Sequence, residues 1–566
     1  MNSKESQLSV IRTNQIGYIP QLPVDITVLS EEKLTVSDSK GNIVFSKDRV
    51  ELSLDEASGD NAALISLGVL PEGEYTIVSG DTEKKIKVSA DAYDEVTGAL
   101  IKGLYYQRCG LKLEEKYAGI YAHPACHTAE CTEWEDRSVK KLVLGGWHDA
   151  GDYGKYVGPG AVTVAHMLYA YRLFPNGCTD KLNIPESGNG VPDILNEARW
   201  ELEWILKMQK DDGSFYHKLT KDHFAPFIMP EDDKDPEYLL PVSHCATEAA
   251  IACLALASRI YRTFDKDFSE KTLSAALKGW EWVEKNPEFK PFMSPKEVRT
   301  GMYGDWSDKD ERFWAAVELY ADTLDEKFKK AAEDIYAAAK DPEELEKIRE
   351  KMPPFMKPIF QNRKPGLDVT QYGWMDVSGL GAICCLFEIG EKGGKVLYDE
   401  VKKDFLDRSK SIIDTCKTSG YGTSLKSDQY VWGSILTVMS NAMSMIFNSM
   451  LTGNRDLLEY VNNQFNYALG LNALDISFIT GFGERRIMNP HHRPSGADGI
   501  EEPVPGLISG GPNKRMTYPE TKELLGEDTP PAKYFRDQTP SADTNEIAIY
   551  WNSPAIFTGA FLNSLK

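Results

Sequence analysis

Two aspartates in a glycine-rich run are the residues of this sequence best suited to chemistry. Asp149 and Asp152 lie three positions apart within residues 145–156, which read Gly-Gly-Trp-His-Asp-Ala-Gly-Asp-Tyr-Gly-Lys-Tyr. The glycines let the backbone turn tightly, so the two carboxylates can converge on one point. Two carboxylates at one site can hold and polarise a water molecule, as a general base in glycoside hydrolysis must. The alternative interpretation is a structural Asx-turn.

A single glutamate near the C-terminus, Glu546, is the candidate for the complementary acid. Aromatic residues follow it at Tyr550 and Trp551. A carboxyl group in an apolar setting can donate a proton if burial raises its pKa. An ordinary surface glutamate is the alternative.

A proline-bounded loop, residues 489–493, presents a second set of polar candidates. His491 follows Pro490 directly, and Arg493 lies two residues after His491. An imidazole and a guanidinium can hydrogen-bond sugar hydroxyls or a carboxylate. The alternative is a basic pair that balances local acidic charge.

Two metal sites are suggested by residue type. Cys109, Cys126, His127 and His148 form a set of two thiolates and two imidazoles, which favours structural zinc in a tetrahedral site. Because His148 precedes Asp149 directly, zinc would fix the loop that enters the aspartate run, and removing zinc should loosen that loop. The alternative is two buried thiols and a surface histidine. Residues 305–311 hold four acidic side chains that offer oxygen ligands for calcium, or else an acidic helix N-terminus.

Tryptophans outside the long apolar runs are candidates for stacking on sugar rings, whose C–H faces are apolar. Trp432 lies in the run 430–434, and Trp551 lies five residues after Glu546. A core position is the alternative for each of them.

The first part of the chain predicts a small all-β sandwich. Short β-rich runs alternate with turn signals such as Lys-Gly-Asn at residues 40–42 and Pro-Glu-Gly at residues 71–73. Strands this short at this spacing are typical of a sandwich. We therefore expect an immunoglobulin-like domain over residues 1–92. The expected strands cover residues 25–29, 33–36, 43–46, 63–67, 75–78 and 85–88.

The rest of the chain, residues 93–566, predicts an all-α domain with almost no intervening strands. Its amphipathic runs have the helical period, and a toroid of helical hairpins would gather their loops, and the unusual residues in them, at one end. The expected helices cover residues 161–173, 193–209, 243–262, 273–285, 310–324, 327–339, 379–389, 395–416, 434–451 and 457–469.

Composition limits the partners that the chain can have. The net charge of −22 argues against nucleic acid as a partner and favours a neutral or cationic ligand. The most apolar run, residues 434–451, contains enough serine and asparagine to predict a buried helix, so we expect no membrane association. Nine cysteines, several in apolar runs, do not predict disulfides. Residues 1–7 lack an apolar leader core, so we expect a cytoplasmic protein, or a secreted one whose signal peptide is missing from this sequence.

Three segments taken together resemble glycoside hydrolase family 9, the cellulase family with an (α/α)6 barrel. They are the aspartate run at residues 145–156, the loop that ends at residues 489–493 and the C-terminal segment that contains Glu546. By this resemblance Asp152 is the base, Asp149 orients the attacking water and Glu546 is the acid, while His491 and Arg493 contact substrate. Position 542 departs from the family pattern, because alanine stands where an aromatic residue is expected. The residues that match the central and C-terminal motifs are Ser477, Ile479, Thr480, Gly483, Arg485, Pro490, His491, Arg493, Phe535, Asp537, Glu546, Ala548, Asn552 and Ser553.

The resemblance extends to the N-terminal region and the metal sites. Residues 14–18, Asn-Gln-Ile-Gly-Tyr, look like the start of the immunoglobulin-like module that precedes one branch of the family. That branch implies zinc at the two cysteines and two histidines. It also implies calcium at Asp310 and Glu311, joined by Asp376. Trp432 resembles a position that stacks on a glucosyl unit.

The expected activity is therefore inverting hydrolysis of β-1,4-glucosidic bonds in cellulose, related β-glucans or cello-oligosaccharides. An inverting enzyme needs about 6.5–9.5 Å between its base and acid carboxyls. The alternatives are an exo-acting β-glucosidase or β-glucosaminidase of the same family, or a glycan-binding protein without turnover. We expect a monomer with no organic cofactor.

Overall fold

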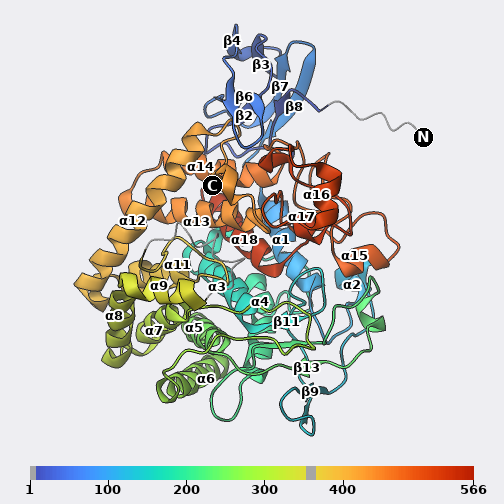
Figure 1. Cartoon of the computed structure of the whole chain (residues 1–566). Coiled ribbons are helices and arrows are strands. Elements are labelled where there is room, and N and C mark those ends of the chain that lie inside the picture. The colour runs from blue at the N-terminus through green and yellow to red at the C-terminus, as the bar shows by residue number, and fades with distance from the viewer. Residues whose placement is uncertain (1–7, 352–364) are drawn as a thin grey trace. The chain divides into compact units, whose positions relative to one another are not determined.

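The computed structural model describes residues 8–351 and 365–566, and the chain forms two compact units. Unit 1 comprises Met1–Gly103, Leu173–Leu182 and Ser409–Lys566, and unit 2 comprises Leu104–Arg172 and Asn183–Arg408. Figure 1 labels many of the helices and strands of both. The sandwich predicted over residues 1–92 belongs to unit 1, and residues 93–566 contribute to both units.

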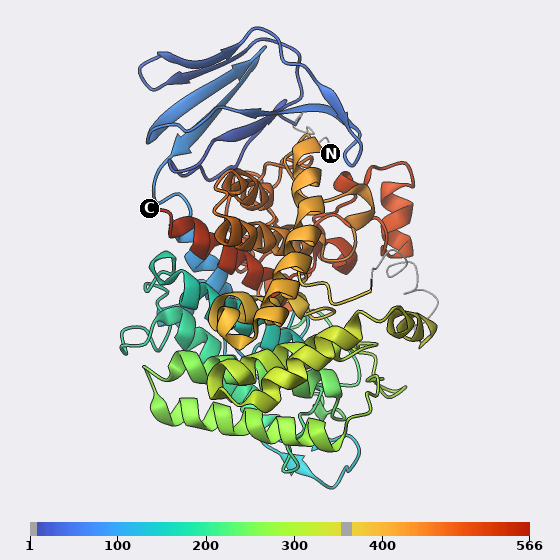
Figure 2. The ribbon, with the colours of Figure 1, turned by 90° about the vertical axis from the view of Figure 1, so that its left-hand side faces the viewer.

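The N-terminal part of unit 1 is a sandwich of two four-stranded antiparallel sheets, drawn in blue in Figure 2. One sheet has the order β1-β2-β6-β5 and the other has the order β4-β3-β7-β8. Each predicted strand overlaps an observed one, whereas the short β1 and β5 have no counterpart in the prediction. The strands are β1 (Ile11–Arg12), β2 (Asp25–Val28), β3 (Leu34–Asp38), β4 (Ile43–Lys47), β5 (Ser53–Asp55), β6 (Asp60–Ser66), β7 (Gly73–Ser79) and β8 (Thr82–Val88).

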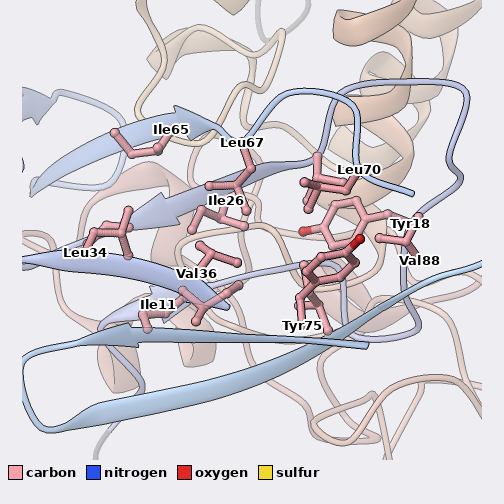
Figure 3. Packing of buried hydrophobic residues seen from close by; sticks show 14 of the residues in the cluster. Ile11, Tyr18, Ile26, Leu34, Val36, Ile65, Leu67, Leu70, Tyr75 and Val88 are labelled. Atoms are coloured by element: carbon pink, nitrogen blue, oxygen red, sulfur yellow. The ribbon is translucent and has the colours of Figure 1, made fainter. Parts of the chain in front are cut away.

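The core of the sandwich follows from alternation along its strands. In β7, Tyr75 and Ile77 are buried, whereas Glu74, which precedes Tyr75 and points to the opposite face, is exposed, as a period of two requires. Figure 3 shows side chains from both sheets, Val36 and Ile26 among them, packed against one another. This apolar cluster holds the two sheets together.

The sandwich contacts the helices of unit 1 largely through polar groups. The Thr27 hydroxyl donates to the Gly420 carbonyl at 2.9 Å, and Asn463 Nδ2 donates to Asp25 Oδ2 at 2.6 Å. Asn14 Nδ2 donates to Asn466 Oδ1 at 2.8 Å. Asn463 and Asn466 both lie on α14 (Leu457–Ala468), so one helix receives much of this polar junction.

The helices of unit 1 surround α18, which is buried along its whole length and packs against α13 and α14. Among the described residues, α13 alone is long and apolar enough to cross a membrane, but 72% of that window is buried inside the protein. The helices wholly in unit 1 also include α13 (Ser434–Thr452), α15 (Arg493–Ala497), α16 (Pro519–Leu525), α17 (Ala542–Asn545) and α18 (Ile549–Asn563), while α1 (Asp94–Tyr106) and α12 (Lys395–Thr418) each have residues in both units.

Unit 2 is built on helices that pack pairwise, α5 on α6, α5 on α7 and α7 on α8, as the green ribbons in Figure 2 show. All the predicted helices overlap observed ones, but the predicted run 379–389 divides into α11 and the π-helical turn η4 (Cys384–Ile389). The helices are α2 (Glu115–Ala118), α3 (Val157–Leu173), α4 (Asp193–Lys207), α5 (His244–Tyr261), α6 (Lys266–Lys285), α7 (Lys309–Thr323), α8 (Glu326–Ala339), α9 (Pro342–Lys351) and α11 (Ser378–Ile383). The 3-10 turns of unit 2 are η1 (Gly119–Tyr121), η3 (Pro230–Asp232) and η5 (Gly390–Gly393), and those of unit 1 are η2 (Pro175–Gly177), η6 (Ser427–Gln429) and η7 (Pro531–Lys533).

The expectation of almost no strands after residue 92 is wrong for unit 2. A five-stranded sheet of order β10-β9-β13-β12-β11 lies there. Its strands are two or three residues long, too short for a period of two to be recognised in the sequence. They are β9 (Cys131–Glu133), β10 (Lys140–Lys141), β11 (Lys155–Tyr156), β12 (Lys218–Thr220) and β13 (Tyr238–Leu239).

Candidate active site

The aspartate run of unit 2 is a tight loop that its glycines make possible. Gly145 and Gly146 both have positive φ, and a Cβ at position 146 would lie 2.7 Å from the Trp204 ring. The loop closes through the Asp149 amide, which donates to the Gly154 carbonyl at 2.9 Å. It then runs directly into β11 and α3, so regular elements hold its C-terminal end.

Both aspartate side chains are largely buried, at 1% exposed for Asp149 and 7% for Asp152. Asp152 Oδ2 accepts from the Gly154 amide at 3.0 Å. A Cβ at position 154 would lie 2.8 Å from that oxygen and 2.7 Å from the Tyr156 hydroxyl, so glycine leaves room for both groups. Asp149 Oδ2 accepts from the Tyr303 hydroxyl at 2.5 Å. Sequence reasoning missed Tyr303, because it lies 154 positions after Asp149 in the chain and belongs to no recognisable local motif.

The two cysteines and two histidines come together as predicted by their residue types, with one donor atom of each within 4.8 Å of the others. Cys109 Sγ is 3.7 Å from His127 Nδ1, and Cys126 Sγ is 3.9 Å from His148 Nε2. The two imidazole nitrogens are 3.4 Å apart. Tetrahedral zinc with ordinary bond lengths places nitrogen pairs about 3.3 Å apart and sulfur–nitrogen pairs about 3.6 Å apart. The donor set therefore fits zinc in both type and spacing.

A carboxylate supports this cluster from outside. His127 Nε2 is 3.2 Å from Asp233 Oδ2, while Nδ1 faces the other donors. A hydrogen bond at one ring nitrogen orients the other nitrogen toward a metal. His127 also has a φ of 46°, a left-handed conformation that costs free energy for a histidine and persists only where other interactions outweigh that cost.

The acidic residues of unit 2 gather in a set that differs from the predicted one. Asp305, Asp310 and Glu311 place carboxylate oxygens within 4.8 Å of one another, and burial together with Asp310 and Asp305 raises the pKa of Glu311 well above its usual range. A divalent cation would offset that repulsion. Asp376 is not part of this set: its Oδ1 accepts hydrogen bonds from the Ser378 hydroxyl and amide. The residue after Asp376, Val377, donates its amide to Asp310 Oδ2 at 2.9 Å.

In unit 1, Glu546 stands immediately after the short helix α17 and is half-buried. Its carbonyl accepts from the Gly510 amide at 2.8 Å, and its backbone pairs with that of His491. Asp537 connects the two segments, since its carboxylate accepts from the Met488 and Asn489 amides, each at 2.8 Å, and from Asn545 Nδ2 at 2.9 Å. The structure thus brings Glu546 and the His491 loop together.

His491 and Arg493 differ in charge at neutral pH. Burial, and to a lesser extent the Arg493 charge, lowers the pKa of His491 to about 4, so its imidazole is neutral. His491 Nδ1 lies 2.6 Å from the Thr539 carbonyl and must carry the proton, which makes Nε2 the acceptor. Arg493 is only 5% exposed and starts α15.

The two candidate tryptophans have different environments. Trp432 is half-buried and meets Tyr518 edge to face, with ring centroids 5.5 Å apart. Burial, with the charge of Glu546, raises the pKa of Tyr518 to about 12, so this pair lies near the acid candidate. Trp551 is 2% exposed, and its ring packs against Gly433 and Gly510. This corrects the expectation for Trp551, which is a core residue rather than a stacking surface.

Comparison with known proteins identifies the family. A sequence model described as glycosyl hydrolase family 9 matches residues 93–559. The chain belongs to glycosyl hydrolase family 9. Among family 9 relatives, it is 33% identical to a cellodextrinase of Butyrivibrio fibrisolvens, over 97% of this chain and 98% of the relative. It is 32% identical to endoglucanase D of Acetivibrio thermocellus, over 98% of this chain and 84% of that protein.

Solved family 9 structures agree with this result. A thermostable endoglucanase from Alicyclobacillus acidocaldarius matches with a TM-score of 0.86 and 30% identity, covering 98% of this chain and all of the other. A Zn-binding triple mutant of the family 9 endoglucanase J30 matches with a TM-score of 0.85 and 26% identity, over 96% and 99% of the two chains. The predicted fold class, an (α/α)6 barrel preceded by a small all-β sandwich, and the predicted enzyme class, a glycoside hydrolase, are confirmed.

Proposed function

We propose that this family 9 enzyme hydrolyses β-1,4-glucosidic bonds in cellulose, related β-glucans or cello-oligosaccharides, with inversion at the anomeric carbon. The relatives named cellodextrinase and endoglucanase support the substrate class. The observation that carries the chemical part is the pair of buried aspartates, which share one glycine-bounded loop and differ in their partners.

In the proposed mechanism Asp152 is the general base. Asp149, fixed by the Tyr303 hydroxyl, orients the water molecule that Asp152 deprotonates as oxygen attacks the anomeric carbon. Glu546 donates its proton to the leaving glycosidic oxygen, and neutral His491 and charged Arg493 bind sugar hydroxyls. Trp432 contributes a ring for stacking on a glucosyl face.

We also propose that the cluster of Cys109, Cys126, His127 and His148 holds structural zinc. The tetrahedral spacing of the donors and the Zn-binding mutant among the similar structures support this. For Asp305, Asp310 and Glu311 we propose calcium, because their mutual repulsion calls for a cation. Val377, the residue after Asp376, contributes an amide hydrogen bond to Asp310 at this site.

The anomeric form of the first product tests this proposal. Cellohexaose is hydrolysed in an NMR tube with wild type, Asp152→Asn and Glu546→Gln. We expect α-anomeric product from wild type, and a loss of kcat of about 100-fold or more for each variant with cellohexaose binding retained. A β-anomeric first product would contradict inversion.

The product lengths separate the remaining alternatives. Glucose as the sole early product would favour an exo-acting β-glucosidase, and turnover of a glucosaminide alone would favour a β-glucosaminidase. Binding without any turnover by wild type would identify a glycan-binding protein and would contradict the proposed activity.

A further inference from the structure

A buried lysine next to the aspartate loop has no role in the mechanism above. Lys218 is the first residue of β12, is 0% exposed, and pairs in the sheet with Tyr156, four residues after Asp152. Its Nζ donates to the Gly301 carbonyl at 2.7 Å, to Thr300 Oγ1 at 3.1 Å and to Ser294 Oγ at 3.2 Å. The Thr300 carbonyl is a fourth, longer contact at 3.5 Å, and every one of these acceptors of the buried ammonium is a neutral oxygen.

The acceptors of Lys218 belong to the segment that carries Tyr303. Next to Lys218, His217 Nε2 lies 2.8 Å from the Met302 carbonyl, so the side chains of two consecutive residues hold the consecutive carbonyls of Gly301 and Met302. Tyr303 follows at once with a φ of 45°, a left-handed conformation that needs such support. Its hydroxyl then reaches Asp149.

The charge of Lys218 acts on the other aspartate. Burial lowers the pKa of Lys218 to about 7, and the negative charge of Asp152 opposes that shift. The same attraction, seen from the carboxylate, favours ionised Asp152. Tyr156 lies near both groups: its ring centroid is 5.6 Å from Lys218 Nζ, and its hydroxyl and Asp152 Oδ2 both border the space that Gly154 leaves open.

We propose that Lys218 is a positioning residue of the hydrolytic site: it fixes segment 300–303 so that Tyr303 orients Asp149, and its positive charge keeps Asp152 ionised as the base. The inference rests on the proposed roles of Asp149 and Asp152. It adds a cation in unit 2 that controls both aspartates without touching the substrate.

Two substitutions separate the two effects. Lys218→Met removes both the charge and the hydrogen bonds. Lys218→Gln removes the charge but keeps an amide donor for Gly301. We expect both variants to move the acid limb of the kcat/KM profile upward by about one pH unit, because the pKa of Asp152 rises without the ammonium. We expect kcat at the optimum to fall about 10- to 100-fold in Lys218→Met and less in Lys218→Gln, with KM within about twofold of wild type.

A double-mutant cycle tests the connection through Tyr303. If Lys218 acts on Asp149 through Tyr303, the variant Lys218→Met/Tyr303→Phe should be no slower, within about twofold, than the slower single variant. Multiplied losses would overturn that connection, and an unmoved acid limb in both Lys218 variants would overturn the effect on Asp152. Lys218→Gln serves if Lys218→Met does not fold.

Two controls complete the experiment. Lys210→Gln removes a lysine of the same unit whose Nζ pairs with Glu133 at 2.9 Å, and it should leave the acid limb in place. Asp152→Asn distinguishes a failure of the proposed base assignment from a failure of the proposed role of Lys218. Full activity in Asp152→Asn would contradict the base assignment itself, whereas an inactive Asp152→Asn beside unchanged Lys218 variants would contradict only the role of Lys218.

Discussion

Two regions of the molecule each hold a pair of carboxyl groups that are buried or half-buried, with opposite chemical results. In unit 2, Asp149 and Asp152 receive hydrogen bonds from a tyrosine hydroxyl and a backbone amide, and the ammonium of Lys218 acts on Asp152. In unit 1, Asp25 of the sandwich meets Glu459 of α14, and the two titrate together.

The difference lies in what surrounds the carboxyl groups. At the junction of the sandwich with α14, burial raises the pKa of Asp25, and burial together with the Asp25 charge raises that of Glu459 to about 7. Burial and the nearby acidic residues Asp25 and Asp456 raise the pKa of Glu459, so Glu459 keeps its proton to higher pH than an ordinary glutamate does. Both pairs receive hydrogen bonds, so the nearby ammonium of Lys218 is what distinguishes the aspartates of unit 2 from the acid pair of unit 1.

Loss of zinc from the cluster next to Asp149 should have the largest effect on stability and kcat. It should remove the difference between the aspartates of unit 2 and the carboxyl pair of unit 1. Cys126→Ser or chelation should abolish bound zinc and cost about 3–4 kcal/mol of stability when free zinc exceeds its Kd by 100- to 1,000-fold. Because His148 and Asp149 are adjacent, kcat should fall at least about tenfold at temperatures where the protein is still folded. Zinc content by mass spectrometry, circular dichroism and kcat provide the measurements.

The control for zinc loss is Cys178→Ala, a half-buried free thiol outside the cluster, which should change neither zinc content nor kcat. Full turnover by zinc-free protein, with only its thermal stability reduced, would show that the metal does not position the aspartates.

Removal of the amide that supports Asp25 should have an intermediate effect, limited to stability. In Asn463→Ala, Asp25 loses a 2.6 Å hydrogen bond while remaining buried, which should cost about 2 kcal/mol in the free energy of unfolding. Denaturant unfolding measures this cost. We expect kcat on cellohexaose to stay within about twofold of wild type, and a larger loss of kcat would contradict the separation of the two regions.

The pH dependence of stability should show the smallest effect. The pKa of Glu459 is raised in the folded state, so its contribution is complete below the unfolded value of about 4.5 and is lost as pH rises through about 7. The melting temperature of wild type should therefore decline from pH 5 to pH 8, and Glu459→Gln should flatten that decline. An unchanged slope in the variant would assign the pH dependence to other groups. The negative charge of Asp456 also raises the pKa of Glu459.

Much of the fold could be predicted because its periodicity is local. Amphipathic helices such as α4 bury one face and expose the other, and this pattern is visible in the sequence. The fully buried α18 has no polar face and contains Pro554, so it lacks both the period and the usual composition of a helix. The two- and three-residue strands of unit 2 are likewise too short for any period.

The candidate site could be predicted where its residues form a motif and not where they act from a distance. Asp149 and Asp152 stand in a distinctive glycine-rich run. Tyr303 and Lys218 are single residues in unremarkable surroundings, and their importance comes from pairings of strands and loops far apart in the chain. Trp551 failed as a stacking candidate because α18 is covered on every side, which the sequence around Trp551 does not reveal.

The polar character of the sandwich junction has a consequence for sequence variation among relatives. An apolar interface tolerates many substitutions of similar size, but the hydrogen bonds of Asn14 to Asn466 and of Asp25 to Asn463 each need a donor matched to an acceptor. The residue pairs 14/466 and 25/463 should therefore change together across the branch that carries the sandwich. A sandwich transplanted from a relative should fold onto this α14 only when it brings the matching partners.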